Sequence, residues 1–109
     1  GQYRAMKIVR QHSLGKKAAK ARLESALPSL LQQFGGSVSD LKYAWQNYVW
    51  KCSFKARGFG VKGTLEITDT EVKLDLRLPF LARAFEGTIR SNIEPELDRM
   101  RRKQQGDSN

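Results

Sequence analysis

Apolar residues recur every three or four positions between residues 78 and 100, which is the spacing of one face of an α-helix. The apolar positions are Leu81, Phe85, Ile89, Ile93, Leu97 and Met100. Charged residues fill most positions between them, so the pattern predicts a long amphipathic helix whose apolar stripe another part of the chain must cover. Gly87, Pro95 and a capping-box pattern at residues 91–94 favour, as an alternative, two helical segments bent around a sheet.

A second helical pattern covers residues 16–34. Its apolar stripe consists of Ala19, Leu23, Ala26, Leu27, Leu30 and Phe34. Pro28 lacks an N–H group for the helix hydrogen bonds, so it predicts a kink or break. Gly35 and Gly36 predict the end of the helix.

The rest of the chain alternates between apolar and polar residues with a period of two, which is typical of strands with one buried face. Residues 6–11 form a first short strand. A hairpin follows with a turn near residues 46–47, and this turn places Trp45 opposite Tyr48 and Tyr43 opposite Trp50 as an aromatic ladder. Gln-Asn is a weak turn sequence, so a register shifted by one residue is the alternative.

Two further strands, residues 61–67 and 71–78, surround a predicted turn at residues 69–70. This turn places Leu65 opposite Leu74 on the apolar side, Glu66 opposite Lys73 on the polar side, and Gly63 opposite Leu76. A glycine inside a strand marks a bulge or a close approach by another element. We expect that neighbour to be the final helix.

The predicted order is β-α-β-β-β-β-α, and one face of the strands is polar. This pattern predicts an α+β fold in which an antiparallel curved sheet carries the long C-terminal helix and the first helix on one face. We expect residues 6–103 to form a single domain. Residues 1–5 are expected to be an N-terminal extension or an added remnant, and residues 104–109 a disordered tail.

The 109-residue chain has a net charge of +9, and its first 35 residues hold seven Lys or Arg against one acid. The candidate surface-binding residues are Lys16, Lys17, Lys20 and Arg22, which load the first two turns of the predicted helix. Such a basic surface suits phosphate, an anionic surface or an acidic partner. The alternative is a solvated face that keeps the protein in solution.

Composition and short motifs argue against several kinds of site: disulfides, structural metal sites, membrane-spanning segments and phosphate-binding loops. One cysteine cannot form an internal disulfide and fits a cytoplasmic protein. A single histidine and a single cysteine argue against a structural zinc site, and we expect no cofactor and no metal. No apolar run approaches the roughly 18 residues of a membrane-spanning helix, and the N-terminal residues lack the apolar core of a signal peptide. The spacing of a phosphate-binding loop is also absent.

His12 and Cys52 are the two residues with the chemistry of a catalytic pair. His12 is interpreted either as a titrating group or as a structural hydrogen-bonding group between strand and helix. Cys52 shares the parity of Trp50 and Phe54, which favours a small buried apolar residue over a nucleophile. A nucleophile pair of Cys52 and His12 lacks an evident third group to orient it.

An apolar pocket beneath the final helix is the second candidate site. Its candidate residues are Tyr43, Trp45, Trp50, Phe54, Phe85 and Ile89. The alternative is that these side chains form a plain core. Base stacking would need the aromatic rings to be exposed, whereas their parity directs them towards the core.

Several short patterns, in order, carry a family resemblance: residues 12–14 (HSL), 43–45 (YAW), 60–63 (GVKG), 71–76 (EVKLDL), 78–81 (LPFL), 85–89 (FEGTI) and 93–97 (IEPEL). From about Met6 to Met100 the chain resembles the polyhydroxyalkanoic acid system family, also called polyhydroxyalkanoate granule region proteins. The resemblance implies a small cytoplasmic bacterial protein linked with storage polyester granules. It implies no established enzymatic activity and no catalytic residues.

Three functional hypotheses follow. The first is a non-enzymatic accessory protein that binds the granule surface or granule proteins, with an amphipathic helix presenting apolar surface to the polyester. The second is weak nucleic-acid binding through the basic first helix. The third is an apolar small-ligand binder, or an enzyme built on such a pocket. An unpaired edge strand additionally allows a homodimer.

Overall fold

The computed structural model describes residues 3–32, 38–56 and 58–107, and their side chains except at residues 31, 85 and 101–107. The elements are β1 (Tyr3–Gln11), α1 (Lys16–Gln32), β2 (Val38–Gln46), β3 (Val49–Ala56), β4 (Phe59–Ile67), β5 (Glu71–Pro79), a 3-10 helix η2 (Phe80–Phe85) and α2 (Glu86–Asp107). The predicted endings at Phe34, Gly35 and Gly36 lie outside the described residues, as does Arg57 in the loop between β3 and β4.

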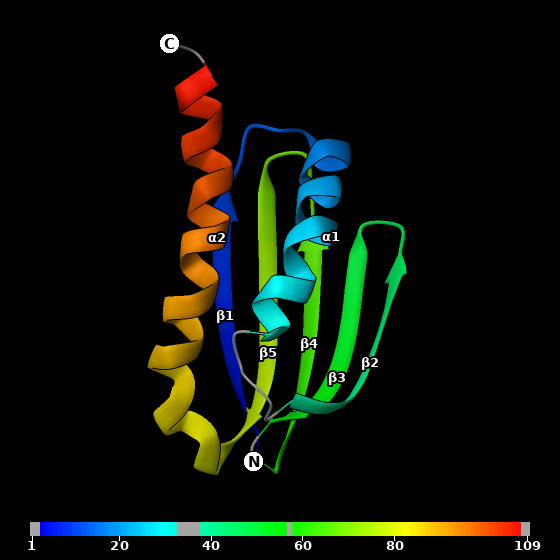
Figure 1. Cartoon of the computed structure of the whole chain (residues 1–109), viewed down its shortest axis with the longest axis vertical. Coiled ribbons are helices and arrows are strands. Elements are labelled where there is room, and N and C mark those ends of the chain that lie inside the picture. Colours follow the sequence, from blue (N-terminus) through cyan, green and yellow to red (C-terminus); the bar gives the residue numbers. More distant parts are fainter. Residues whose placement is uncertain (1–2, 33–37, 57, 108–109) are drawn as a thin grey trace.

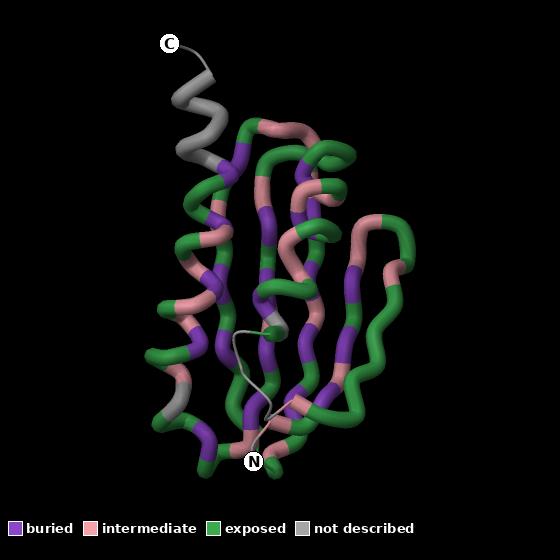
Figure 2. The backbone as a smooth tube through the Cα atoms, in the orientation of Figure 1, coloured by how far each residue is buried: buried purple, intermediate pink, exposed green. Residues whose placement is uncertain are grey.

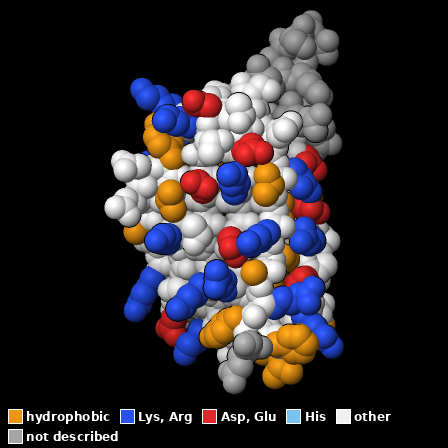
Figure 3. Space-filling model, turned by 180° about the vertical axis from the view of Figure 1, so that it is seen from behind, with side chains coloured by type: hydrophobic (Ala, Val, Ile, Leu, Met, Phe, Trp, Pro, Cys, Tyr) orange, Lys and Arg blue, Asp and Glu red, His pale blue; other side chains and the backbone are white. Residues whose placement is uncertain are grey.

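The five strands form one sheet in the order β1-β5-β4-β3-β2, and every pair of neighbours is antiparallel. Both helices lie on one face of the sheet, with α2 along the β1 side and α1 nearer the middle, while the β2–β3 hairpin extends beyond them (Figure 1). The opposite face carries charged side chains (Figure 3). The predicted α+β class, its element order and its antiparallel sheet with both helices on one face are therefore confirmed.

The core lies between the sheet and the two helices. Alternate residues of β1, β3, β4 and β5 are buried, whereas no residue of β2 is fully buried (Figure 2). From the helices, the core receives Ala19, Leu23, Leu30, Ile89, Ile93, Leu97 and Met100. The final helix therefore covers the sheet with the stripe that its sequence predicts, from Ile89 onwards.

The predicted β4–β5 register is confirmed. Leu65 pairs with Leu74, Glu66 with Lys73, and Gly63 with Leu76. The expected neighbour of Gly63 was wrong, however. A Cβ atom at Gly63 would lie 2.9 Å from Leu76 Cδ2 and 3.0 Å from Cys52 Sγ, so the adjoining strands, and not α2, occupy this space.

The turn predicted for the β2–β3 hairpin was wrong by one residue, and the predicted cross-strand pairs were therefore wrong as well. Trp45 pairs with Trp50 and Tyr43 with Cys52, so Asn47 and Tyr48 form the turn. Asn47 adopts φ 56°, a left-handed conformation that asparagine tolerates better than glutamine does. The turn therefore lies at Asn47 and Tyr48, one residue later than predicted, and the aromatic ladder pairs Trp45 with Trp50.

The predicted start of the final helix was also wrong. Residues 80–85 form a 3-10 helix, which has three residues per turn, and Leu81 is 80% exposed while Ala82 is buried. Neither proline breaks its helix, because α1 continues through Pro28 and α2 through Pro95. Ser91 does not start a new segment, since its hydroxyl donates to the Gly87 carbonyl at 2.7 Å within one continuous helix.

The first strand and the final helix both extend further towards the ends of the chain than the sequence predicted. β1 begins at Tyr3, which pairs with Pro79, and α2 ends at Asp107. The division of the chain into extension, domain and tail stays a prediction.

Candidate functional surfaces

Two of the four candidate surface-binding cations of α1 contact the tip of the β2–β3 hairpin. Lys16 Nζ lies 5.0 Å from the centre of the Tyr48 ring, and Lys20 Nζ lies 4.9 Å from that of Trp45. Lys20 also donates a hydrogen bond of 2.7 Å to the Asn47 carbonyl. These cation–π and hydrogen-bond contacts join α1 to the turn of the hairpin, whose Tyr48 carbonyl also accepts a hydrogen bond from the Ile67 N–H of β4 at 2.9 Å.

The other two cations are placed differently. Lys17 is exposed, and Arg22 is half-buried. The structure therefore brings only Lys16 and Lys20 together over aromatic rings. A role for any of the four in binding a partner stays a prediction.

His12 is buried where β1 gives way to α1. The Leu14 N–H donates to His12 Nδ1 at 3.2 Å, so the ring proton is assigned to Nε2, which donates to the Thr68 carbonyl at 2.9 Å. The His12 backbone N–H donates to the Thr70 carbonyl at 2.9 Å. Both ring nitrogens are thus used to join the β1–α1 connection to the β4–β5 turn, as the structural interpretation of His12 predicts.

Cys52 is buried on β3, as its parity predicts. Burial raises the pKa of its thiol from the ordinary 9.0 to about 11, although a hydrogen bond with the Gly63 backbone acts in the opposite direction. The thiolate is the reactive form of cysteine, so this environment suppresses nucleophilic chemistry near neutral pH.

The reactivity of Cys52 towards iodoacetamide should therefore depend on folding. At pH 8 we expect alkylation of the native protein to be about 100-fold slower than that of the protein in denaturant, because two pKa units separate their thiolate fractions. The native rate should keep rising with pH up to about 11, whereas the rate in denaturant should level off near 9. Equal native and denatured rates at pH 8 would show that the thiol is accessible and ionised.

The aromatic candidates line two separate spaces. A groove of about 490 Å³ between α1 and β2 is lined by Glu24, Leu27, Pro28, Gln32, Val38, Leu41, Tyr43, Trp45 and Trp50. The rings of Tyr43 and Trp50 lie 6.1 Å apart and are tilted by 42°. Leu27 and Leu41 were missed as groove residues, although each belongs to an apolar pattern in the sequence.

The space beneath α2 is much smaller. It measures about 50 Å³ and is lined by apolar side chains that include Trp50, Phe54 and Ile93. Ligand pockets usually hold about 300 Å³ or more, so this space is a packing gap. Ile89 is buried in the core, and the side chain of Phe85 lies outside the described part of the structure. Ligand binding by any of the six candidates stays a prediction.

An exposed apolar tip lies where β5 leads into α2, and we define it as Phe80 and Leu81. Phe80 is 47% exposed and Leu81 is 80% exposed. The Arg83 guanidinium lies 4.5 Å from the centre of the Phe80 ring, so a cation borders the apolar surface. Apolar side chains gather at this end of the molecule (Figure 3). Sequence reasoning assigned Leu81 to the core and therefore missed the tip.

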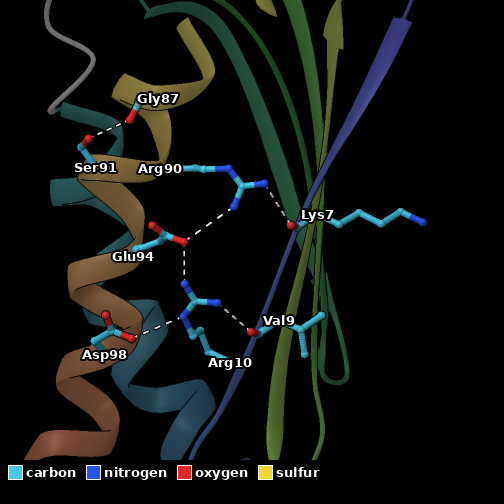
Figure 4. Close-up of polar contacts among 8 residues, drawn as sticks. All are labelled: Lys7, Val9, Arg10, Gly87, Arg90, Ser91, Glu94 and Asp98. Atoms are coloured by element: carbon cyan, nitrogen blue, oxygen red, sulfur yellow. Dashed lines mark hydrogen bonds and ion pairs between the residues drawn. The ribbon is translucent and has the colours of Figure 1, made fainter.

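The two edges of the sheet differ. At the β1 edge, Arg10 pairs with Glu94 at 2.5 Å and with Asp98 at 3.4 Å, and it donates to the Val9 carbonyl at 2.9 Å (Figure 4). Arg90 donates to the Lys7 carbonyl at 3.4 Å and lies 3.6 Å from Glu94 (Figure 4). The Arg10 and Arg90 guanidinium groups therefore hydrogen-bond to carbonyl groups of β1 that do not pair with another strand. At the other edge, no strand in the described ranges pairs with the open side of β2.

Two further properties concern residues 3–32, 38–56 and 58–107. Within these ranges, no three His, Cys, Asp or Glu side chains are grouped so that they could hold a metal ion. No helix there is long and apolar enough to cross a membrane.

Comparison with known proteins places the chain in a family. The model of the polyhydroxyalkanoic acid system proteins, the polyhydroxyalkanoate granule region family, matches residues 6–100. No curated protein matches the chain. The match includes all but the first three residues of β1, all but the last seven of α2, and every element between them, so it covers the surfaces described above.

Proposed function

Because this chain belongs to the family of polyhydroxyalkanoic acid system proteins, we propose that it is a non-enzymatic accessory protein of bacterial polyester storage that works in the cytoplasm and docks on the granule surface. The observation that carries this proposal is the apolar tip of Phe80 and Leu81. A storage polyester offers a largely apolar surface, and the tip offers apolar side chains that the protein itself leaves uncovered.

The amphipathic α2 helix is not the docking element in this proposal. Its stripe packs against the sheet, and Ile89, Ile93, Leu97 and Met100 all belong to the core. Presenting these residues to a granule would require α2 to leave the sheet and expose that core. The tip needs no such rearrangement, because Leu81 already projects from the fold.

The strength of the contact can be gauged from the area that it removes from water. Full burial of a leucine or phenylalanine side chain is worth about 1.5–3 kcal/mol. Part of Phe80 is already covered, so we assign about 3 kcal/mol to the two residues together. Arg83 beside Phe80 adds a cation suited to any anionic groups at the surface.

The test is co-sedimentation of the protein with purified polyhydroxyalkanoate granules at physiological salt. The double substitution Phe80→Ser and Leu81→Ser should weaken binding about 100-fold, which corresponds to about 3 kcal/mol. Val9→Ser is the matched control, because Val9 is also an exposed apolar residue but lies on β1 away from the tip. Recovery of the unaltered protein in the supernatant, or equal binding by all three forms, would refute docking through the tip.

A further inference from the structure

We propose that the open edge of β2 binds an extended segment of a partner protein in which apolar residues alternate with acidic ones. The segment would add a sixth strand to the sheet, with its apolar residues over the α1–β2 groove and its acids on the outer face. This inference does not depend on granule docking, because it uses residues of β2 and its neighbours and none of the tip.

The first argument is the contrast between the two edges. In an antiparallel pair, every second residue directs its N–H and C=O groups away from its partner, so an edge strand presents a row of free donors and acceptors. At β1, Arg10 and Arg90 donate hydrogen bonds to two of these carbonyls, and α2 lies alongside the strand (Figure 4). β2 has no such cover among the described residues, and an irregularity between Ser39 and Lys42 leaves residues 42–46 as its regular paired segment.

The second argument is the apolar surface beside this segment. Tyr43 is 62% exposed although it faces the helix side of the sheet, and Trp45 is half-buried. Both line the groove of about 490 Å³ under α1. Side chains of an added strand lie about 5 Å from their neighbours on β2, so apolar residues placed there would cover Tyr43 and Trp45.

The third argument is the charge on the outer face of the same strands. Lys42 projects from β2, and Lys51 from β3 lies opposite the small residue Ala44. Lys62 on β4 lies opposite Ser53 of β3, and these side chains surround a shallow hollow with Ala44 and Thr64. Cations cover this part of the outer face, which is on the left in Figure 3.

These charges select the partner. Neighbouring strands are about 4.8 Å apart, so a glutamate of the added strand opposite Ala44 can reach across it towards Lys51, while another pairs with Lys42. Glu24 borders the groove on the other side, so the inner residues of the partner should be apolar, not acidic. Lys55 is already paired with Asp40 at 3.7 Å and contributes less.

A second copy of this chain fits the edge less well. Each copy carries a net charge of +9, and pairing two β2 strands would bring two sets of these lysines together. The only acid in β2, Asp40, lies at the irregularity and already pairs with Lys55. Charge complementarity therefore favours an acidic partner over self-association.

The experiment titrates the whole protein with a labelled ten-residue peptide of alternating glutamate and valine, read by fluorescence anisotropy and by amide hydrogen exchange. We expect binding to protect alternate amides within residues 42–46 about tenfold or more, and to leave those of β1 unchanged. Lys42→Glu should weaken binding about tenfold. Lys7→Glu, which makes the same charge change at an exposed lysine of β1, should leave the affinity within about twofold.

Two altered peptides separate strand pairing from simple charge attraction. A peptide with lysine in place of glutamate should not bind, and one N-methylated on alternate residues should lose most of its affinity although its charge is unchanged. Undiminished binding of the N-methylated peptide, or protection on β1 in place of β2, would overturn the proposal. A dimer in sedimentation equilibrium whose β2 amides are protected without peptide would overturn it in favour of a second copy.

Discussion

Leu97→Ala is expected to lower the free energy of unfolding by about 2–5 kcal/mol. Leu97 lies on α2 and is only 3% exposed, and it lines the small apolar space between the helices and the sheet. Truncation removes buried methyl groups and enlarges that space, and the surrounding strands cannot close it completely. Urea denaturation monitored by tryptophan fluorescence measures the change.

Leu81→Ala is the matched control for this prediction. The sequence assigns Leu81 and Leu97 to the same helical stripe, but Leu81 projects from the 3-10 helix into solvent. Its truncation should change the free energy of unfolding by no more than about 0.5 kcal/mol. Similar losses for the two variants would place Leu81 in the core and would contradict the exposed tip.

Gly63→Val is the second large effect, with an expected loss of about 3 kcal/mol in the free energy of unfolding. The new Cβ atom would lie 2.9 Å from Leu76 Cδ2 and 3.0 Å from Cys52 Sγ, closer than van der Waals contact allows. Either the neighbouring side chains leave their rotamers or the three central strands separate. Thermal unfolding followed by circular dichroism provides the measurement.

Gly60→Val separates this crowding from the general effect of replacing glycine in a strand. Gly60 lies on the same strand, but a Cβ atom there meets no atom within 4 Å, so the change should be neutral or slightly stabilising. In a double-mutant cycle, Leu76→Ala should relieve at least about 1 kcal/mol of the Gly63→Val loss. If the losses in the free energy of unfolding are additive, the clash caused by Gly63→Val does not involve the Leu76 side chain.

The parts of the fold that sequence predicted well depend on local chemistry. The turn at residues 69–70 and the alternation on either side of it fix the β4–β5 register. A shift of one strand by one residue would move its leucine, Leu65 or Leu74, to the polar face, and the short turn disfavours a shift by two. The stripe of α2 from Ile89 onwards follows from the 3.6-residue period alone. The interpretation of Cys52 as a buried small residue follows from its parity with Trp50.

The parts that sequence missed depend on small conformational differences or on distant contacts. Leu81 moved out of the stripe because residues 80–85 wind with three residues per turn, a choice that apolar spacing does not distinguish over so short a segment. The left-handed conformation of Asn47 shifted the β2–β3 turn. Arg10 and Glu94 are 84 positions apart, so no local pattern reveals that they close the β1 edge.

The same limits apply to the candidate surfaces. The sequence identified a basic first helix, but only the fold shows that Lys16 and Lys20 lie over Tyr48 and Trp45. It identified aromatic side chains on one face of a hairpin. Only the fold shows that Tyr43, Trp45 and Trp50 border an open groove beside α1, and that the space beneath α2, which Trp50 and Phe54 line, is a packing gap.

The central claim is that the Phe80–Leu81 tip faces the granule, and a fluorescent label tests it most directly. Leu81→Cys labelled with an environment-sensitive dye reports polarity at the tip, and the buried Cys52 should stay unlabelled near neutral pH. Val9→Cys provides the same report from β1. On addition of purified granules, we predict a blue shift and a rise in intensity at position 81 and little change at position 9. Equal responses at the two positions, or none at position 81, would contradict docking through the tip.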